Sequence, residues 1–343
     1  MNANLPKIKL CPICNGNENK VIRVINYEVA AQHYVFKEMD PDRFAALANH
    51  IKKLWNQDTC EIIRCTSCGF VFCFPFIAGD AKFYDLGFER SGYPKWKWEF
   101  AVSYEAIIKM LRPDFRLLEL GAGDGAFIKK LANIKLPASN ILCTEYSDFG
   151  RKEIEKLGVK CLMDDVRSLN EDAFRHSFDA ICMFQVLEHL DNIDDLFAKL
   201  KWLMKDGASL FIAVPNDKRI EFNEMNKALL DMPPNHVGRW NKKCFSIMAK
   251  RFGLTIKDYQ LEKSGIFDRA KQFITYRFLF KAQVSGSIEN HLVVLAKGKY
   301  GNLAKMIGVA LNLVPALPAL PVLLNTNATL GDSQWVHLVN VQE

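Results

Sequence analysis

Short apolar runs alternate with segments of helical periodicity between residues 100 and 262. Such alternation predicts successive βαβ units and a mostly parallel sheet, because parallel strands need a crossover connection. Right-handed crossovers place helices on both faces of that sheet. We therefore expect a doubly wound, Rossmann-like α/β fold with seven strands. The predicted strands are Leu117–Leu120, Asn140–Thr144, Val159–Leu162, Phe178–Met183, Ser209–Val214, Thr255–Leu261 and Trp335–Val341.

An amphipathic helix is expected ahead of this alternating region. Asp40 is a favourable N-cap residue, and proline, here Pro41, is favoured in the first turn of a helix. Apolar side chains then recur at the spacing of one helix face. They are Phe44, Leu47, Ile51 and Leu54.

The longest apolar segment runs from Met306 to Leu324. A membrane-spanning helix needs roughly 20 residues, so the length just suffices, but prolines inside the segment oppose a span. The interrupting residues are Asn312, Pro315, Pro318 and Pro321. We expect a helical insertion that is buried or lies in a subunit interface; contact with a membrane surface through 306–324 and a true span are the alternatives.

Composition places the 343-residue chain among ordinary globular proteins, with 49% hydrophobic and 24% charged residues. The formal charge of +6 is spread along the chain, so nucleic acid is not indicated as a partner. The first residues lack the apolar core of a secretory signal, and we expect a cytoplasmic protein, with peripheral membrane association as the alternative. The ten cysteines are then expected to be thiols or metal ligands.

A glycine-rich turn follows the first predicted strand, where Gly121, Gly123 and Gly125 precede a helix start. Glycine lets the backbone bend sharply and lets a ligand approach it closely. The spacing alone also fits the dinucleotide fingerprint, in which a pyrophosphate sits on the helix N-terminus. Acidic residues at Glu119 and Asp124 instead favour a cationic ligand, such as a sulfonium that carries an ammonium group.

Further acids follow the next two predicted strands. Glu145 ends the second strand, where a carboxylate can accept hydrogen bonds from both hydroxyls of a ribose. Asp164 and Asp165, with Val166, follow the third strand and are placed to meet an adenine ring at its edge. The sequence does not choose between the two aspartates.

With these residues in view, residues 100–262 and the last strand resemble the class I S-adenosylmethionine-dependent methyltransferases. The motifs that carry the resemblance are Leu118–Gly125, Glu145, Asp165-Val166, Phe184–Leu190, Lys205-Asp206-Gly207 and Val214-Pro215-Asn216. The resemblance implies S-adenosylmethionine as cofactor. The residues it implies for cofactor binding are Glu119, Gly121, Gly123, Gly125, Glu145, Asp165, Val166 and Gln185. It puts Gly121 and Gly123 beside the methionine moiety and Gln185 at the reactive end.

Two CxxC pairs lie near the N-terminus, Cys11-Pro-Ile-Cys14 and Cys65-Thr-Ser-Cys68. Each pair can present two thiolates to one tetrahedral metal, and zinc is the natural occupant. The long stretch of sequence between the two pairs costs little free energy, because the entropy lost in closing a loop grows only with the logarithm of its length. Four protein ligands would fill the shell, so we expect a structural zinc without a catalytic role. Iron held by four thiolates, or unpaired thiols, are the alternatives.

This organisation resembles a narrower group, the sugar C-methyltransferases and related glycan-pathway enzymes, in which a four-cysteine module precedes the same core. Besides the cysteines, Gly69–Phe72 and Pro233–Trp240 match that pattern. We expect three parts: a zinc-ribbon module with its inserted helix over 1–85, the cofactor-binding core over 86–275, and the apolar insertion with the last strand over 276–343. The long insertion between the cysteine pairs and the proline-rich tail depart from the pattern.

His236 is the candidate catalytic base. It follows the fifth predicted strand, on the carboxyl edge of the sheet where ligands bind, and histidine titrates near neutrality. A histidine that only hydrogen-bonds substrate or backbone is the alternative. Arg239 and Trp240 could grip a phosphorylated or sugar-bearing acceptor, or Trp240 could pack in the interior. Glu188-His189 is either catalytic or a helix-capping pair beside the cofactor.

The sequence thus predicts an enzyme that moves a methyl group from S-adenosylmethionine to a sugar, nucleotide-sugar or glycan acceptor. A sulfonium is already a strong electrophile, so the protein must mainly align the acceptor and exclude water. One alternative is an O-methyltransferase for a quinol-like or lipid-linked acceptor, favoured if 306–324 contacts a membrane. Another is a zinc-ribbon protein that binds or modifies RNA. The sequence leaves the oligomeric state open.

Overall fold

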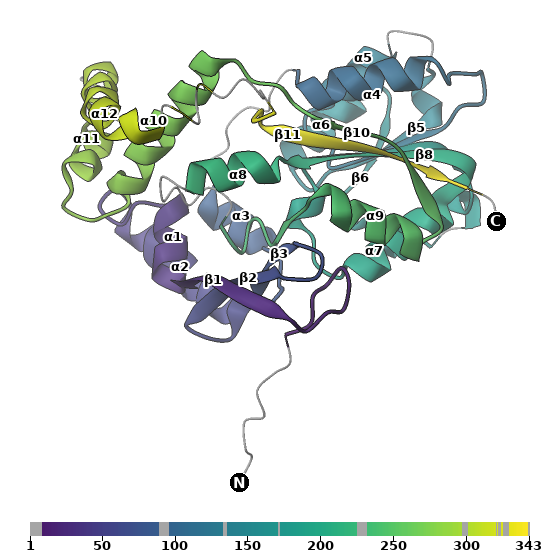
Figure 1. Cartoon of the computed structure of the whole chain (residues 1–343). Helices are drawn as coiled ribbons and strands as arrows, with labels where there is room; N and C mark the ends of the chain where they lie inside the picture. Colours follow the sequence, from purple (N-terminus) through teal and green to yellow (C-terminus); the bar gives the residue numbers. More distant parts are fainter. Residues whose placement is uncertain are drawn as a thin grey trace.

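A seven-stranded sheet forms the centre of the fold, with strand order β10-β11-β8-β7-β4-β5-β6 (Figure 1). Its strands are β4 (Leu117–Leu120), β5 (Ile141–Thr144), β6 (Lys160–Leu162), β7 (Phe178–Phe184), β8 (Met204–Pro215), β10 (Leu254–Leu261) and β11 (Ser333–Asn340). β11 runs antiparallel to β8 and β10, and the other pairs are parallel. The predicted α/β sheet of seven strands is confirmed. The computed structural model describes residues 9–88, 96–132, 136–170, 172–224, 232–296, 301–319, 321, 324 and 329–341.

Helices cover both faces of the sheet, which explains why β4, β5 and β7 are buried along their whole length and are mainly apolar, with Glu119, Thr144 and Asp179 as the polar exceptions. One face packs against α4 (Trp98–Ile108), α5 (Ala126–Ala132) and α6 (Asp148–Glu155). The other packs against α7 (Ile193–Leu203) and α9 (Lys242–Arg251). Figure 1 shows these two layers on either side of the sheet.

The N-terminal module is a second, antiparallel sheet with two inserted helices. Its own strands are β1 (Asn19–Asn26), β2 (Thr59–Cys65) and β3 (Val71–Phe74). α1 (Tyr27–Tyr34) and α2 (Pro41–Trp55) lie between β1 and β2. The Asp40 side chain accepts a hydrogen bond from the Arg43 N–H at 3.1 Å, so the predicted capped helix is confirmed as α2. The sequence pattern did not predict α1.

The fourth strand of this module comes from the far side of the core. β9 (Gly238–Arg239) follows α8 (Asp217–Glu224) in the chain and pairs with β3. The apolar core below β3 is also shared, because Phe70 and Phe72 belong to the same buried cluster as Phe197 on α7. The module and the central sheet are therefore built around one continuous core.

The C-terminal region forms a helical insertion before the last strand, as predicted. It consists of α10 (Ile266–Ala282), α11 (Ile288–Ala296), α12 (Gly301–Ala316) and the 3-10 turn Leu317–Ala319. The predicted boundary between residues 275 and 276 falls inside α10. Among the described residues, no helix is long and apolar enough to cross a membrane.

Burial of the apolar segment within this chain was the wrong expectation. Met306 is 69% exposed and Val314 is 72% exposed. The reason is that the described side chains of α12 that are buried, Gly308 and Asn312, lie on one face, and its other described side chains stay exposed. Residues 320, 322 and 323 of the predicted segment lie outside the described residues.

Candidate active site and metal centre

The glycine turn after β4 has the backbone that the sequence predicted. Gly121, Gly123 and Gly125 all have positive φ, at 65°, 59° and 78°, a backbone conformation that residues other than glycine rarely adopt. A Cβ on Gly121 would also lie 2.5 Å from Cγ2 of Val186, in the loop after β7. The Gly121 N–H donates to the Thr144 carbonyl at 2.9 Å, which ties the turn to the end of β5.

Glu119 is a buried carboxylate at the end of β4, only 2% exposed. Burial raises its pKa well above the ordinary value, the nearby Glu145 raises it further, and Lys97 opposes the rise. Within the described part of the chain, Oε2 of Glu119 has no hydrogen-bond partner. A buried carboxylate oxygen without a partner is costly, and a cationic ligand beside it would remove that cost. This side chain fits the positively charged donor that the sequence predicts.

Glu145 is fixed at the end of β5 by two backbone hydrogen bonds. Its Oε2 accepts from the Gly123 N–H at 2.8 Å, and its Oε1 accepts from the Ser147 N–H at 2.8 Å. Each carboxylate oxygen keeps a second lone pair that can accept from a ribose hydroxyl. Gly150 permits this arrangement, because a Cβ there would lie 2.3 Å from the Gly123 carbonyl oxygen. The sequence analysis overlooked Gly150, whose only sign was a glycine inside a helical pattern.

Of the two aspartates after β6, Asp165 is half-buried and Asp164 is exposed. Asp165 caps a short 3-10 turn and pairs with Arg167, with Nη2 to Oδ2 at 2.6 Å and Nε to Oδ1 at 2.9 Å. Burial alone would raise the pKa of Asp165, but Arg167 lowers it below the ordinary value. Asp165 is therefore an ionised acceptor with Val166 buried beside it.

Two large side chains at the same edge of the sheet stay exposed. Tyr146 follows β5 and is 60% exposed, and Met163 follows β6 and is 55% exposed. Both adjoin the acids expected at the nucleoside. Exposed apolar groups that flank a polar crevice provide surface against which a flat ring can stack. The sequence analysis did not single them out, although each stands directly beside a predicted site residue.

Gln185 follows β7 in a left-handed conformation, with φ at 59°. Its side-chain amide donates to Glu99 of α4 at 3.2 Å and to Ser333 of β11 at 3.0 Å. A non-glycine residue in this region is strained, and such strain gathers at functional sites. Glu99 and Ser333 are remote in sequence, so only the fold identifies them as the groups that hold Gln185.

The loop after β7 continues into a cluster of polar side chains. Glu188, His189 and His236 each offer a ligand atom within 4.8 Å of the others. The two imidazole rings meet edge to face, with centroids 4.7 Å apart. The Val237 N–H donates to the Glu188 carbonyl at 2.9 Å, which ties the two loops together. The structure thus brings the predicted base beside the Glu188-His189 pair, in a set that could also hold a metal.

The proton on His189 can be placed from its neighbours. Its Nδ1 lies 2.9 Å from the Asn235 carbonyl oxygen and 3.2 Å from the Tyr84 hydroxyl. Because a carbonyl oxygen only accepts, Nδ1 carries the proton, and Nε2 is left 3.8 Å from Oε1 of Glu188. Burial, and then Glu188, raise the pKa of Tyr84, so its phenol stays protonated. Tyr84, on α3 (Ala81–Gly87), is a site residue that the sequence did not indicate.

The expected acceptor-gripping roles of Arg239 and Trp240 change in the structure. Trp240 is 1% exposed and stacks on Phe197 and Phe245, so it packs in the interior and cannot stack on an acceptor. Arg239 is 9% exposed and forms an ion pair with Glu224 at 2.8 Å. Arg239 and His236 both line a small hollow against β3.

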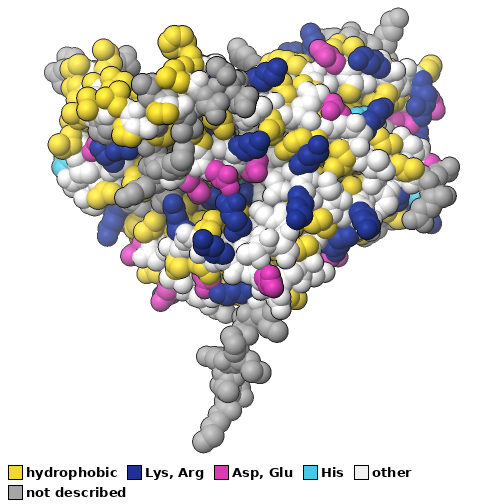
Figure 2. Space-filling view, viewed as in Figure 1, with side chains coloured by type: hydrophobic (Ala, Val, Ile, Leu, Met, Phe, Trp, Pro, Cys, Tyr) yellow, Lys and Arg dark blue, Asp and Glu magenta, His cyan; other side chains and the backbone are white. Residues whose placement is uncertain are grey.

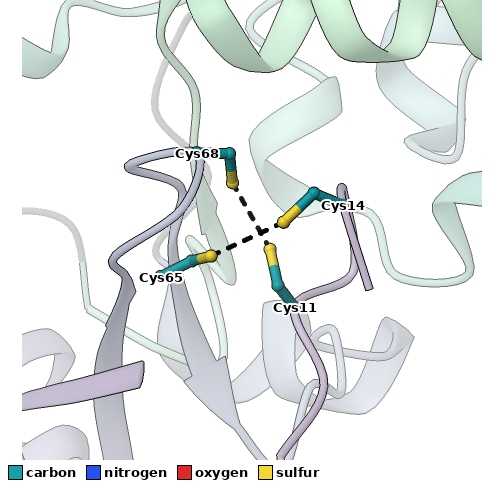
Figure 3. Close-up of side chains that lie close together, drawn as sticks. All are labelled: Cys11, Cys14, Cys65 and Cys68. Atoms are coloured by element: carbon teal, nitrogen blue, oxygen red, sulfur yellow. Dashed lines mark hydrogen bonds between the residues drawn. The ribbon is translucent and has the colours of Figure 1, made fainter. Parts of the chain in front are cut away.

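The four predicted cysteine ligands converge. Figure 3 shows their sulfurs pointing toward a common centre from two loops. The Sγ atoms of Cys11 and Cys68 are 3.5 Å apart, and those of Cys14 and Cys65 are 3.6 Å apart. Zinc–sulfur bonds of about 2.3 Å in a tetrahedron place sulfurs about 3.8 Å apart, so the spacing fits zinc.

The cluster also favours a thiolate. Burial opposes ionisation of Cys65, but the Cys68 N–H and the Cys14 thiol outweigh it and lower the pKa of Cys65 to about 7. α9 of the core packs on the same loops through hydrogen bonds to their carbonyls. The Lys243 ammonium donates to the Ser67 carbonyl at 2.6 Å, and the Arg251 guanidinium donates to the Ile13 carbonyl at 2.8 Å.

Comparison with known proteins gives a match between part of this chain and one family model. Residues 118–210 match a family model described as a methyltransferase domain. This match covers the glycine turn, Glu145, Asp165 and the loop after β7. The part of the chain that holds the predicted cofactor crevice is therefore similar to a methyltransferase domain, which supports the predicted enzyme class. A search of curated proteins gives no match.

Three of the solved structures to which the chain is similar are the following. Phosphoethanolamine N-methyltransferase 2 of Haemonchus contortus is 14% identical, with a TM-score of 0.39; the match covers 70% of this chain and 53% of that one. The [4+2]-cyclase SpnF is 16% identical, with a TM-score of 0.44 and coverage of 75% and 86%. A SAM-dependent methyltransferase from Archaeoglobus fulgidus is 13% identical, with a TM-score of 0.42 and coverage of 69% and 91%.

Proposed function

We propose that the protein transfers a methyl group from S-adenosylmethionine to an oxygen or carbon of a sugar, nucleotide-sugar or glycan acceptor. One observation carries the proposal: the loop after β7 serves both halves of the site. Val186 lies against the glycine turn, while Glu188 and His189 lie beside His236. A donor at the turn and an acceptor at the histidines would therefore meet along this loop.

The residues of the crevice suit the cofactor. The partnerless oxygen of Glu119 would balance its positive charge, Glu145 would accept from the ribose, and Asp165 with Val166 would border the adenine. When bound, S-adenosylmethionine supplies an electrophilic methyl group on a sulfonium. Gln185, held by Glu99 and Ser333, would border that end of the crevice and limit the approach of water.

His236 is the proposed base. A hydroxyl or acidic C–H acceptor must lose a proton as its new bond to the methyl carbon forms, and a nearby imidazole can take it. Glu188, 2% exposed, would stabilise the positive charge that the proton brings to the histidine pair. The pair of imidazoles, with Tyr84 close to His189, offers hydrogen bonds that suit a polyhydroxylated acceptor.

We further propose that zinc bound by the four cysteines positions His236. Cys68 is three residues before Val71, which pairs with Arg239, and Phe72 pairs with Gly238. His236 is two residues before Gly238, so the metal loop and the base are connected through one short strand pair. Gly238 is needed for this contact, because a Cβ there would lie 2.7 Å from Phe70.

A lipid-linked acceptor is the second candidate. The observation that favours it is the exposed apolar surface of α12, which lies outside the site and would bring the enzyme to a lipid phase. The chemistry at the histidines would be the same for a hydroxyl on either kind of acceptor.

Calorimetric titration with S-adenosylhomocysteine tests the cofactor, and methyl transfer from labelled S-adenosylmethionine tests the acceptor. We expect micromolar binding and turnover with a nucleotide-linked sugar from a panel. Absence of binding at millimolar S-adenosylhomocysteine would remove the whole proposal. Binding with turnover only on lipid extracts would replace the sugar by the second candidate, and turnover only on RNA would overturn both.

A further inference from the structure

The helical insertion carries a broad apolar surface. Figure 2 shows hydrophobic side chains gathered over α11 and α12. On α12 and the turn that follows it, the exposed large apolar side chains are Leu303, Met306, Ile307, Val309, Leu311, Leu313, Val314 and Leu317. Contiguous exposed apolar surface on a folded protein marks a site of contact with a protein or a membrane.

α12 is attached to the rest of the molecule along a single line. Among its described side chains, only Gly308 and Asn312 are buried, and they are one turn apart. Gly308 is required there, because a Cβ would lie 2.2 Å from Phe278. Asn312 donates to the Gly308 carbonyl at 2.9 Å and to Glu289 at 3.4 Å, which itself pairs with Lys281. The other described side chains of α12 are all exposed to some extent and can contact something outside the described chain.

The charge of the segment between Glu289 and Asp332 indicates which kind of partner this apolar surface would contact. Between Glu289 and Asp332 the sequence contains no acidic residue, and it contains three lysines, Lys297, Lys299 and Lys305. The segment therefore carries a net positive charge, which complements the negative surface of an anionic bilayer. A second copy of the chain would instead bring two acid-free, lysine-bearing segments together, which is electrostatically unfavourable.

We propose that α11 and α12 dock the protein on the surface of an anionic lipid bilayer. The docking is peripheral, because the 16 residues of α12 extend only about 24 Å, less than the roughly 30 Å hydrocarbon core. Prolines then end the helix. α12 therefore lies in the interface with its apolar side chains among the upper acyl chains.

The docked surface lies toward the ligand-binding edge of the sheet. Ser333 at the start of β11 pairs with Pro215 at the carboxyl end of β8. Figure 1 shows α10, α11 and α12 beyond this end of the strands. Docking would hold the crevice close to the membrane, where an amphiphilic acceptor is concentrated. The docking itself does not depend on the proposed methyl transfer.

Vesicle flotation of the full-length, metal-loaded protein tests the docking directly. Vesicles of phosphatidylcholine and phosphatidylglycerol at three to one are compared with phosphatidylcholine alone, at low salt. We expect the protein to float with the anionic vesicles and at least tenfold less with the neutral ones. The double variant Met306→Glu/Val314→Glu should float with anionic vesicles at least tenfold less than the wild type. Its control is Val21→Glu/Val24→Glu, which adds the same charges to exposed positions on β1 and should float normally.

S-adenosylhomocysteine binding, measured on all three proteins, separates docking from a folding defect and from the methyl-transfer proposal. Unchanged affinity with lost flotation supports docking. Failure of the wild type to float with anionic vesicles overturns it, as does equal flotation with neutral vesicles. A concentration-dependent dimer that Met306→Glu/Val314→Glu abolishes, without flotation of the wild type, would assign the surface to a second copy instead.

Discussion

The cofactor crevice and the acceptor cluster lie along one loop but are assembled differently. The crevice uses mainly residues that are close in sequence, in the turn after β4 and at the ends of β5 and β6. These three strands are neighbours in one sheet. The acceptor cluster joins Tyr84, His189 and His236, which come from remote segments held by the N-terminal module. Damage to one half should therefore leave the other measurable. The metal, base and glycine predictions test that independence, and the acid prediction tests the sheet that both halves share.

Loss of the metal should have the largest effect. Cys65→Ser removes one of four ligands, and we expect loss of bound zinc, a fall of at least about 3 kcal/mol in the free energy of unfolding, and loss of methyl transfer. S-adenosylhomocysteine should still bind within about threefold of the wild type. The measurements are metal analysis, denaturant unfolding and calorimetry.

Cys161→Ser is the control, since Cys161 lies on edge strand β6 outside the cluster. One zinc per chain is expected in the wild type and in this control. A second equivalent, lost in His189→Gln, would instead mean that Glu188, His189 and His236 hold a metal. Zinc content unchanged by Cys65→Ser would contradict the four-cysteine assignment.

Replacing the base should come next. His236→Gln keeps a polar side chain but cannot take the proton, and we expect kcat to fall by about a thousandfold, within the usual range for a general base. Cofactor affinity should change less than about twofold, because the crevice doesn't use His236. His291→Gln, at an exposed position on α11, is the matched control. Near-normal turnover of His236→Gln would remove His236 as the base.

Lowering the pH should reduce the free energy of unfolding of the sheet that carries both halves of the site. Burial, and then Lys257, lower the pKa of His337 on β11 from 6.5 to about 4. The unfolded chain therefore binds the proton more readily, so the stabilisation is complete above pH 6.5 and is lost as the pH falls toward 4, by about 3 kcal/mol. Unfolding curves across this range should show the loss in the wild type but not in His337→Gln. An equal slope in both proteins would mean that another group dominates.

The smallest effect is expected at the glycine turn, where a matched pair of substitutions is available. Gly121 and Gly207 both have positive φ, at 65° and 73°. A Cβ on Gly121 meets Val186 at 2.5 Å, whereas one on Gly207 meets nothing within 4 Å. Gly121→Ala should weaken S-adenosylhomocysteine binding about a hundredfold, or about 2.7 kcal/mol, while Gly207→Ala keeps it. Equal affinities in calorimetry would show that the loop after β7 does not constrain the turn.

Much of the fold and half of the site could be predicted from local sequence. The central strands β4, β5 and β7 are mainly apolar because both faces of the sheet are covered there, so their burial is visible in the sequence pattern. The glycine turn could also be predicted from the sequence, since positive φ and the close approach of other atoms restrict those positions to glycine. The capped helix α2 and the four converging cysteines were also predicted correctly, from capping chemistry and ligand spacing.

The other half depended on packing that no local pattern records. Trp240 could have faced an acceptor or the core, and only the packing of Phe197 and Phe245 against it shows that it is buried. The Met306–Leu324 segment illustrates the same ambiguity, because an apolar helix has one periodicity whether its partner is a core, a subunit or a lipid.

The sequence by itself determined the strands of the sheet, the glycine turn with its acids and the two cysteine pairs, because each of these leaves a pattern among near neighbours in the chain. Only the tertiary structure decided which remote side chains surround His236, how Gln185 is held and which apolar residues stay exposed. The physical reason is that such contacts depend on how helices and loops pack across the whole molecule, and that packing is a property of the assembled core.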